Sequence, residues 1–259
     1  MSKINDSKSL LIRYLDENEV KIFHLNEIVE YFEDENVNIK ATVEALLRDG
    51  IIKSLQKGLY CRPSFHNEFV LAYYLAPKGA VAYWSALHWH GLTTQFSNTI
   101  FVQSPTLIKN KEVMDVSFQF VKVKPSKATG YQFEGRGNNQ FKITNLEKTI
   151  VDCFDSIGQS VDWSELIKAI YKAKMRNKEL IEACEAVDNV SVIKRLGYLI
   201  ELMEIKNLKT FEKYALQKVN KKYNDLDPSS PSSGSYLAKW RLRLNVSEED
   251  ILQNIKNYY

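Results

Sequence analysis

Cysteine and histidine are scarce in this chain, and their scarcity excludes several classes of site. Only three cysteines and four histidines occur among 259 residues. Cys61, Cys153 and Cys184 lie far apart in the sequence, without the paired spacing of a disulfide framework and without a histidine at zinc-ligand spacing. We therefore expect three small buried side chains, and we predict neither a disulfide nor a metal site.

A long apolar segment is absent as well. No stretch approaches the roughly 20 apolar residues that a helix needs to span a bilayer. The first residues, Met1 to Asp6, are polar and lack the apolar stretch of a secretory signal. These absences predict a cytoplasmic protein without a membrane partner.

Motifs for catalysis are missing too. Residues 134–138 include two glycines but lack the Lys-Ser/Thr pair of a nucleotide-triphosphate loop. Acid-x-Lys triplets begin at Asp6, Glu19 and Glu204, in terminal or helical context rather than on the strand where a metal-dependent nuclease needs them. These features predict that the chain is not an enzyme and uses no cofactor.

Two local groups of reactive residues also give no catalytic pattern. His88 and His90 are two positions apart, so on a helix they diverge by about 200° and cannot hold one metal together. Cys153 lies beside Asp152 on an apolar helix and has no base nearby in the sequence. We interpret these side chains as packing or surface residues.

The most informative segment is residues 24–62. Apolar residues recur there at helical spacing in two runs separated by the polar residues 33–36. The first run is Leu25, Ile28, Val29 and Phe32, and the second is Ile39, Val43, Leu46 and Leu47. Two short apolar strands, 51–55 and 59–62, then flank a turn at Lys57-Gly58. This order predicts a winged helix-turn-helix, a fold that binds DNA.

The second of these helices, over residues 38–49, carries the candidate DNA contacts. If its apolar stripe faces inward, Asn38, Ala41, Ala45 and Arg48 lie roughly opposite. Small alanines allow close approach to a groove. The DNA-contacting residues that we predict are Asn38, Thr42 and Arg48 at base edges, with Lys40, Arg48, Lys53 and Lys57 at phosphates.

The charge balance leaves a second interpretation open. Residues 1–65 hold nine lysines and arginines against eleven acidic residues, a net −2, while the chain as a whole is +3. The remaining 194 residues therefore carry +5 and dominate the long-range attraction to phosphate. Winged helices also serve as protein-interaction modules, so a scaffold that binds a protein partner is the alternative.

For residues 64–259 the pattern predicts a mixed, mainly helical domain with a small β-sheet. The whole chain is therefore expected to belong to the α+β class. The domain boundary is expected near Arg62-Pro63, which gives domains 1–63 and 64–259. Strands are predicted at 98–103, 116–124 and 140–143. Helices are predicted at 66–76, 80–90, 144–154, 162–173, 177–187, 190–204 and 208–222.

A cationic segment follows the proline- and serine-rich loop 227–235. Residues 236–245 alternate, with Lys239, Arg241 and Arg243 on one side and apolar residues on the other, which predicts a half-buried strand. Its charged side has two interpretations. It is either a solvated edge strand protected from aggregation or a surface that contacts nucleic acid.

Five segments in order resemble a known family. They are SALHWHGL at 85–92, ITNLEKTIVDC at 143–153, RLGYLIE at 195–201, DP at 227–228 and KWRLRLN at 239–245, after the N-terminal winged helix. Together they are similar to the AbiEi antitoxins of bacterial type IV toxin-antitoxin (abortive infection) systems, which act in phage defence. The resemblance runs over nearly the whole chain.

The resemblance implies a repressor of its own operon that binds double-stranded DNA, most simply at inverted repeats. It also implies a C-terminal domain that counters a nucleotidyltransferase-like toxin without forming a stable complex with it. On this chain it assigns the DNA role to the residues already named, and Arg195 and Glu201 lie in matching segments. The rival classes are a module that binds the toxin directly and an enzyme that depends on Glu147 or Asp152.

Overall fold

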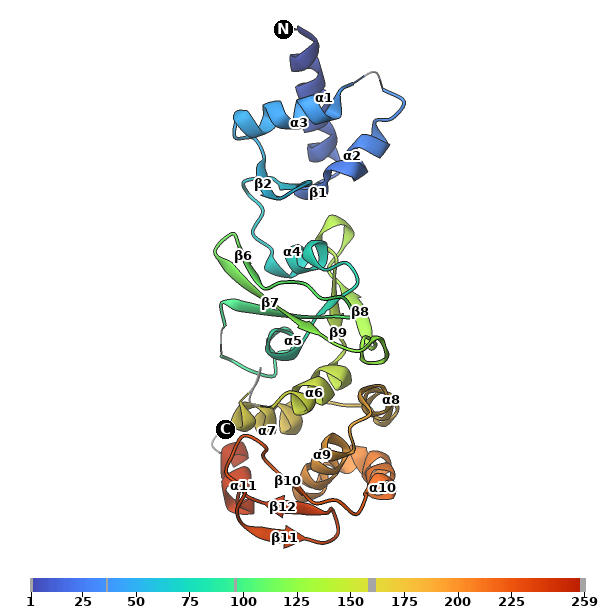
Figure 1. Ribbon diagram of the computed structural model, residues 1–259, viewed down its shortest axis with the longest axis vertical. Coiled ribbons are helices and arrows are strands. Elements are labelled where there is room, and N and C mark those ends of the chain that lie inside the picture. Colours follow the sequence, from blue (N-terminus) through green and yellow to red (C-terminus); the bar gives the residue numbers. More distant parts are fainter. Residues whose placement is uncertain (1, 36, 96, 158–161, 257–259) are drawn as a thin grey trace. The chain divides into compact units, whose positions relative to one another are not determined.

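The chain divides into two compact units in the computed structural model, which describes residues 2–35, 37–95, 97–157 and 162–256 (Figure 1). The first unit runs to Leu71 and includes two short later segments, 112–115 and 135–140. The second unit holds the rest of the chain. The first unit thus continues eight residues past the boundary predicted at residue 63.

Three helices and a three-stranded sheet build the first unit. The elements are α1 (Ser2–Glu17), β1 (Ile22–His24), α2 (Leu25–Tyr31), α3 (Ile39–Arg48), β2 (Lys53–Gln56) and β3 (Leu59–Cys61). The sheet is antiparallel in the order β1-β3-β2. The predicted pair of helices and the hairpin are confirmed, and α1 and β1 are added to them.

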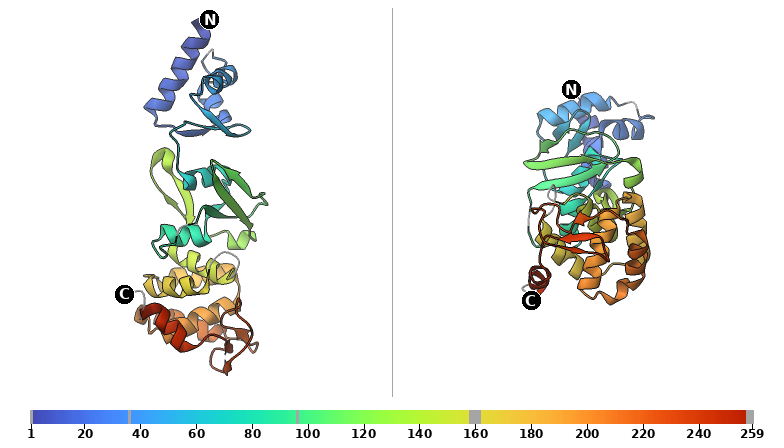
Figure 2. Two further views of the ribbon diagram at one scale, coloured as in Figure 1. Left: turned by 90° about the vertical axis from the view of Figure 1, so that its left-hand side faces the viewer. Right: turned by 60° about the horizontal axis from the view of Figure 1, so that its bottom comes forward.

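One apolar core holds this unit together. Leu11 and Leu15 of α1 lie in it with Phe23 of β1, Val43 of α3 and Ile52. Helix α1 lies beside α3 (Figure 2, left). Removing such side chains from water contributes roughly 1.5–3 kcal/mol each, and this packing gives the short helix α3 a fixed orientation that its own length would not provide.

A six-stranded sheet opens the second unit, and it is larger than the small sheet that we predicted. The strands are β4 (Ala80–Val81), β5 (Thr99–Ser104), β6 (Lys111–Val113), β7 (Val116–Lys122), β8 (Tyr131–Glu134) and β9 (Phe141–Thr144), in the order β6-β7-β5-β4-β9-β8. Strands β5 and β7 are parallel over six residue pairs. Helices α4 (Glu68–Leu75) and α5 (Tyr83–Trp89) complete this part.

Helices dominate the remainder of the second unit, as predicted. They are α6 (Leu146–Asp155), α7 (Trp163–Lys172), α8 (Asn177–Val187), α9 (Val190–Leu202), α10 (Lys209–Lys218) and α11 (Glu248–Lys256). A second three-stranded sheet lies among them, with the order β10-β12-β11. Its strands are β10 (Asn224–Asp225), β11 (Ser235–Leu237) and β12 (Leu242–Leu244). The class of the whole chain is mixed α and β. None of the described helices is both long enough and apolar enough to cross a membrane.

The prediction of one continuous strand over 236–245 is wrong. Strands β11 and β12 pair with each other as an antiparallel hairpin, and residues 238–241 form the turn between them. Arg241 takes the left-handed backbone conformation, with φ of 50°. Trp240 leaves the turn for the protein interior and is completely buried.

Trp240 and Gly197 make a close contact between the hairpin and α9. A Cβ atom added at Gly197 would lie 2.4 Å from two ring carbons of Trp240 and 2.9 Å from the Cβ of Ala215. The absence of a side chain at this position lets the indole ring lie against the helix backbone.

Gly197→Ala is expected to destabilise the second unit by about 1–3 kcal/mol, because the new methyl group overpacks the indole site. Helix propensity alone predicts the opposite sign, a gain of about 0.5–1 kcal/mol. All four tryptophans lie in the second unit, so urea unfolding followed by tryptophan emission measures that unit. If the contact with Trp240 causes the loss, Gly197→Ala should lower the free energy of unfolding by less in a Trp240→Phe background. An equal loss in both backgrounds contradicts the contact.

Candidate nucleic-acid interface

Helix α3 is positioned by its ends and by its buried side. Asn38 caps it, because its Oδ1 accepts a hydrogen bond from the backbone N–H of Ala41 at 3.1 Å. Gly50, with φ of 70°, follows the helix in the left-handed conformation that ends many helices. Ile39, Val43 and Leu46 are buried in the core, so the orientation of the opposite side is fixed.

The exposed side of α3 presents Lys40, Ala41, Glu44 and Arg48. Lys40, Glu44 and Arg48 are spaced four residues apart and therefore follow one line along the helix. Ala41 adds no bulk beside this line. The structure thus places Glu44 at the centre of this exposed side, between the predicted contacts Lys40 and Arg48. The spacing of four residues between these three positions in the sequence already indicated that they share one side of the helix.

Two residues of the predicted reading face are buried instead. Thr42 is 2% exposed, and its hydroxyl donates a hydrogen bond to the backbone oxygen of Asn38 at 2.9 Å. Ala45 is buried as well. The prediction that Thr42 reads a base edge is therefore wrong, because the apolar stripe of α3 is wide enough to include this position. Asn38, Lys40 and Arg48 are exposed, as the prediction requires.

The hairpin that follows α3 places its two lysines on the surface. Lys53 opens β2 and Lys57 lies in the turn, and both side chains are exposed. Gly58 supplies the positive φ of this turn, at 77°, and its carbonyl accepts a hydrogen bond from the N–H of Leu25 at 2.8 Å. The hairpin turn is therefore attached to the start of α2.

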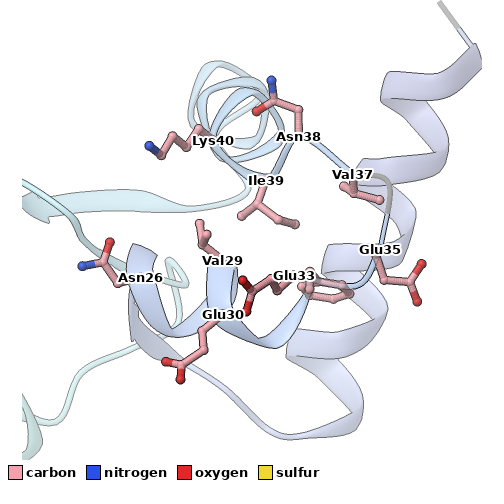
Figure 3. A pocket seen from close by; sticks show the side chains of 10 residues that line it. Asn26, Val29, Glu30, Glu33, Glu35, Val37, Asn38, Ile39 and Lys40 are labelled. Carbon is pink, nitrogen blue, oxygen red and sulfur yellow. The ribbon is translucent and has the colours of Figure 1, made fainter.

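A hollow of about 590 Å³ lies between α2 and α3, and its chemistry differs from that of the exposed face. Val29 of α2 and Ile39 of α3 point toward each other across it (Figure 3). Glu30, Glu33 and Glu35 stand around this apolar floor. These carboxylates repel phosphate, so an anionic partner of this unit is directed to the side that carries Arg48 and the hairpin lysines.

Two ion pairs remove acidic charge from the neighbourhood of α3 and the sheet. Lys8 pairs with Asp49 at 2.6 Å, directly after the last turn of α3. Arg62, after β3, pairs with Asp16 of α1. Both pairs are partly exposed, so each contributes at most about 1 kcal/mol to stability, but each neutralises a carboxylate that would otherwise oppose phosphate.

The three cations predicted to contact nucleic acid in the C-terminal segment each have partners within the protein. Lys239 lies in the hairpin turn and pairs with Glu201. Arg241 donates from Nη1 to the hydroxyl of Tyr223 at 3.1 Å. Arg243 bonds to the hydroxyl of Tyr236 and lies 3.8 Å from a carboxylate oxygen of Asp225. Lys239 and Arg241 lie in the turn of a hairpin and Arg243 lies on β12, so the three do not belong to one strand.

The two acids considered for an enzyme are buried and have partners within the protein. Asp152 is buried, pairs with Lys148, and accepts a hydrogen bond from Gln103 Nε2 at 3.0 Å. Burial raises the pKa of Asp152 to about 6, against the opposing effect of Lys148. Glu147 is also buried and accepts from the backbone N–H of Arg176 at 2.8 Å. Within the described ranges, no three His, Cys, Asp or Glu side chains gather as metal ligands do.

Comparison with known proteins identifies a fold and no family. No family model matches the sequence, and no curated protein matches it. Among solved structures, the chain is similar to the RV2827C protein from Mycobacterium tuberculosis, with a TM-score of 0.62 over 92% of this chain and 90% of that chain. The two sequences are 12% identical, so this likeness concerns the fold alone.

Asn38 has a structural role that is separable from any contact with DNA. Asn38→Ala removes the cap and is expected to weaken α3 by about 1 kcal/mol, whereas Asn38→Asp keeps a side-chain acceptor. Hydrogen exchange of the α3 amides in the full chain measures this, with about fivefold faster exchange expected for Ala alone. Equal exchange in both variants would show that the cap contributes nothing.

Proposed function

We propose that the chain is a non-enzymatic DNA-binding repressor of its own operon and the antitoxin of a type IV toxin-antitoxin system. One observation carries the DNA-binding part. Asn38, Lys40 and Arg48 are exposed along one helix whose other side is buried, and Lys53 and Lys57 are exposed on the adjacent hairpin. The element order of the first unit supports its interpretation as a winged helix-turn-helix.

In this mechanism α3 enters the major groove and the hairpin contacts the neighbouring phosphates. Arg48 has the donor fork that recognises guanine, and Glu44 is an acceptor suited to cytosine N4. Ala41 permits close approach of the helix to the base edges. Repression follows because the bound protein occludes the promoter, and inverted repeats are the expected operator for two bound copies.

The antitoxin part depends on the family resemblance and on the second unit. The segments that carry the resemblance include both Glu201 on α9 and the turn that holds Lys239 and Trp240, which the structure joins by hydrogen bonds. We infer that the toxin is a nucleotidyltransferase-like protein that the chain counters without a stable complex, in the bacterial cytoplasm.

The salt dependence of binding tests the proposed phosphate contacts. Lys40, Arg48, Lys53 and Lys57 predict a slope of log K against log salt near −3.5 per bound copy, since each neutralised phosphate contributes about −0.9. A Lys53→Ala, Lys57→Ala double variant is expected to reduce the slope to about −1.8, measured with the full chain on DNA from upstream of its gene. Lys178→Ala, far along the chain on α8, is the control and leaves the slope unchanged. A slope near zero would contradict the interface.

Sequence preference tests the reading side of α3. Arg48→Ala is expected to cost about 1–3 kcal/mol on the upstream DNA and to reduce the preference over scrambled DNA. Thr42→Val is expected to keep that preference, because the Thr42 hydroxyl is buried. The measurement is a competition titration with both DNAs. If Thr42→Val loses the preference while its α3 amides stay protected from exchange, the proposed orientation of α3 is wrong.

A second candidate is a protein-interaction module, and the hollow between α2 and α3 favours it. An apolar floor with three glutamates around it suits a basic amphipathic segment of a partner protein. Stable co-purification of the toxin with the full chain, lost on Val29→Asp, would favour this candidate. Asn38 and Lys40 line the hollow as well as the proposed DNA-contacting side, so retention of operator preference by that variant would show that partner binding and DNA binding can be separated.

A further inference from the structure

A polar hollow of about 400 Å³ lies in the second unit, where α9 meets the three-stranded sheet β10-β12-β11. Its lining combines cations, tyrosines and an acid, among them Arg195, Lys222, Tyr223, Asp225, Tyr236 and Arg243. We propose that this hollow is a binding site for a phosphate monoester, as carried by a nucleoside 5′-monophosphate or by the 5′ end of a nucleic acid. The proposal stands independently of operator binding by the first unit.

Arg195 forms the fixed base of this site. The residue is 7% exposed, and its Nε donates to the backbone oxygen of Asp225 at 3.1 Å. A longer contact of 3.4 Å joins Nη1 to the hydroxyl of Ser191. Burial lowers the pKa of Arg195, and the negative charges of Asp227, Asp225 and Asp155 oppose this shift. The structure shows no ion pair within 4.0 Å between this guanidinium and the carboxylates of the described residues. The guanidinium group of Arg195 therefore retains N–H donors that can bind an anion in the hollow.

Three further cations lie near Arg195, together with the carboxylates of Asp225 and Asp227. Lys222 lines the hollow and is exposed, and Arg243 lines it from β12. Lys194, the neighbour of Arg195 on α9, is buried and donates to Asn224 Oδ1 at 2.5 Å and to the backbone oxygen of Lys222 at 2.7 Å. Burial, together with the positive charges of Arg195 and Lys222, lowers the pKa of Lys194 to about 8. Four cations, Arg195, Lys194, Lys222 and Arg243, therefore lie near one another beside the carboxylates of Asp225 and Asp227.

The acids of this region accept hydrogen bonds from serine residues, and Asp225 also pairs with Arg243. Asp225 accepts from the hydroxyl of Ser232 at 2.5 Å and lies 3.8 Å from Arg243 Nε. Asp227 accepts from the N–H of Ser229 at 2.8 Å and from two serine hydroxyls. These hydrogen bonds hold the loop 227–233 in place beside the hollow. Because the carboxylates share their charge with these donors, they only partly neutralise Lys222, Arg195 and Arg243.

Two tyrosines favour an organic phosphate over a bare anion. The rings of Tyr223 and Tyr236 meet edge to face with centroids 4.9 Å apart. The guanidinium groups of Arg241 and Arg243 lie 5.3 and 4.9 Å from the centres of these rings. Tyr236 is more than half exposed, so part of its aromatic surface is available to a nucleobase, and such stacking is tolerant of base identity. The volume is in the range of sites for small ligands.

Calorimetric titration of the full chain tests the proposal. The probes are guanosine 5′-monophosphate, guanosine, and a short single-stranded oligonucleotide with either a 5′-phosphate or a 5′-hydroxyl. The phosphorylated probes are expected to bind saturably with a Kd near or below about 1 mM. Their dephosphorylated counterparts are expected to bind at least tenfold more weakly. Tighter binding of the mononucleotide identifies a free nucleotide as the source, and tighter binding of the 5′-phosphorylated oligonucleotide identifies a nucleic-acid end.

Variants separate this site from general positive charge. Lys222→Gln and Arg243→Gln are each expected to weaken the phosphorylated probes by about tenfold. Lys178→Gln, an exposed lysine on α8, is the matched control and is expected to change nothing. Arg195→Lys keeps the positive charge but loses the paired N–H donors of the guanidinium group. This variant is titrated only if its tryptophan emission matches that of the parent chain. Absence of saturable binding, equal binding of guanosine and its monophosphate, or equal loss in the control overturns the proposal.

Discussion

The hydrogen bond from Trp240 Nε1 to the Glu201 carboxylate, at 2.5 Å, fixes the C-terminal hairpin on α9. The same carboxylate binds Lys239 through its other oxygen. Burial opposes ionisation of Glu201, but the two hydrogen bonds keep its pKa below the usual range. Because the indole ring can lie against the helix only where Gly197 leaves space, one contact sets the position of the turn at 238–241.

That contact determines the chemistry nearby. With the turn fixed, β12 starts at Leu242 and pairs in parallel with β10, which brings Arg243 beside Asp225. Arg195, two residues before Gly197 on α9, bonds to the backbone of the same Asp225. The cations of α9 and of the hairpin therefore converge through β10, although they are nearly fifty residues apart in sequence. A residue such as Glu201, which touches no cation of the hollow, nevertheless positions it.

The sequence predicted those elements whose signal is local. Helices α2 and α3 and the β2-β3 hairpin follow from apolar period and a glycine turn, and each was expected within a few residues of its observed bounds. Strands β4, β6 and β8 were not expected, because they are only two to four residues long and their existence depends on the strands beside them. The hairpin at 235–244 was mistaken for one strand, since its turn has Arg241 at positive φ where a glycine would have marked it.

Prediction of the candidate sites failed where local pattern and tertiary environment differ. At about 100° per residue, Thr42 lies within 60° of Ile39 and joins the buried arc, whereas Lys40, Glu44, Arg48 and Ala41 fill one continuous exposed arc. A full helical projection would have excluded Thr42. No such local rule locates the hollow around Arg195, because its lining comes from α9, β10, β11, β12 and the intervening loops.

The two cationic surfaces differ in physical character, and the difference has a consequence for binding. Lys40, Arg48, Lys53 and Lys57 are exposed, so water and salt screen them and each contributes modestly to affinity. Their effect depends on number and on placement, because residues 1–65 carry a net charge of −2. Arg195 is buried and held by backbone and hydroxyl oxygens, so its desolvation cost is met during folding and its orientation is fixed before any anion arrives. Salt should therefore weaken the proposed DNA binding along α3 more steeply than the proposed phosphate binding in the hollow.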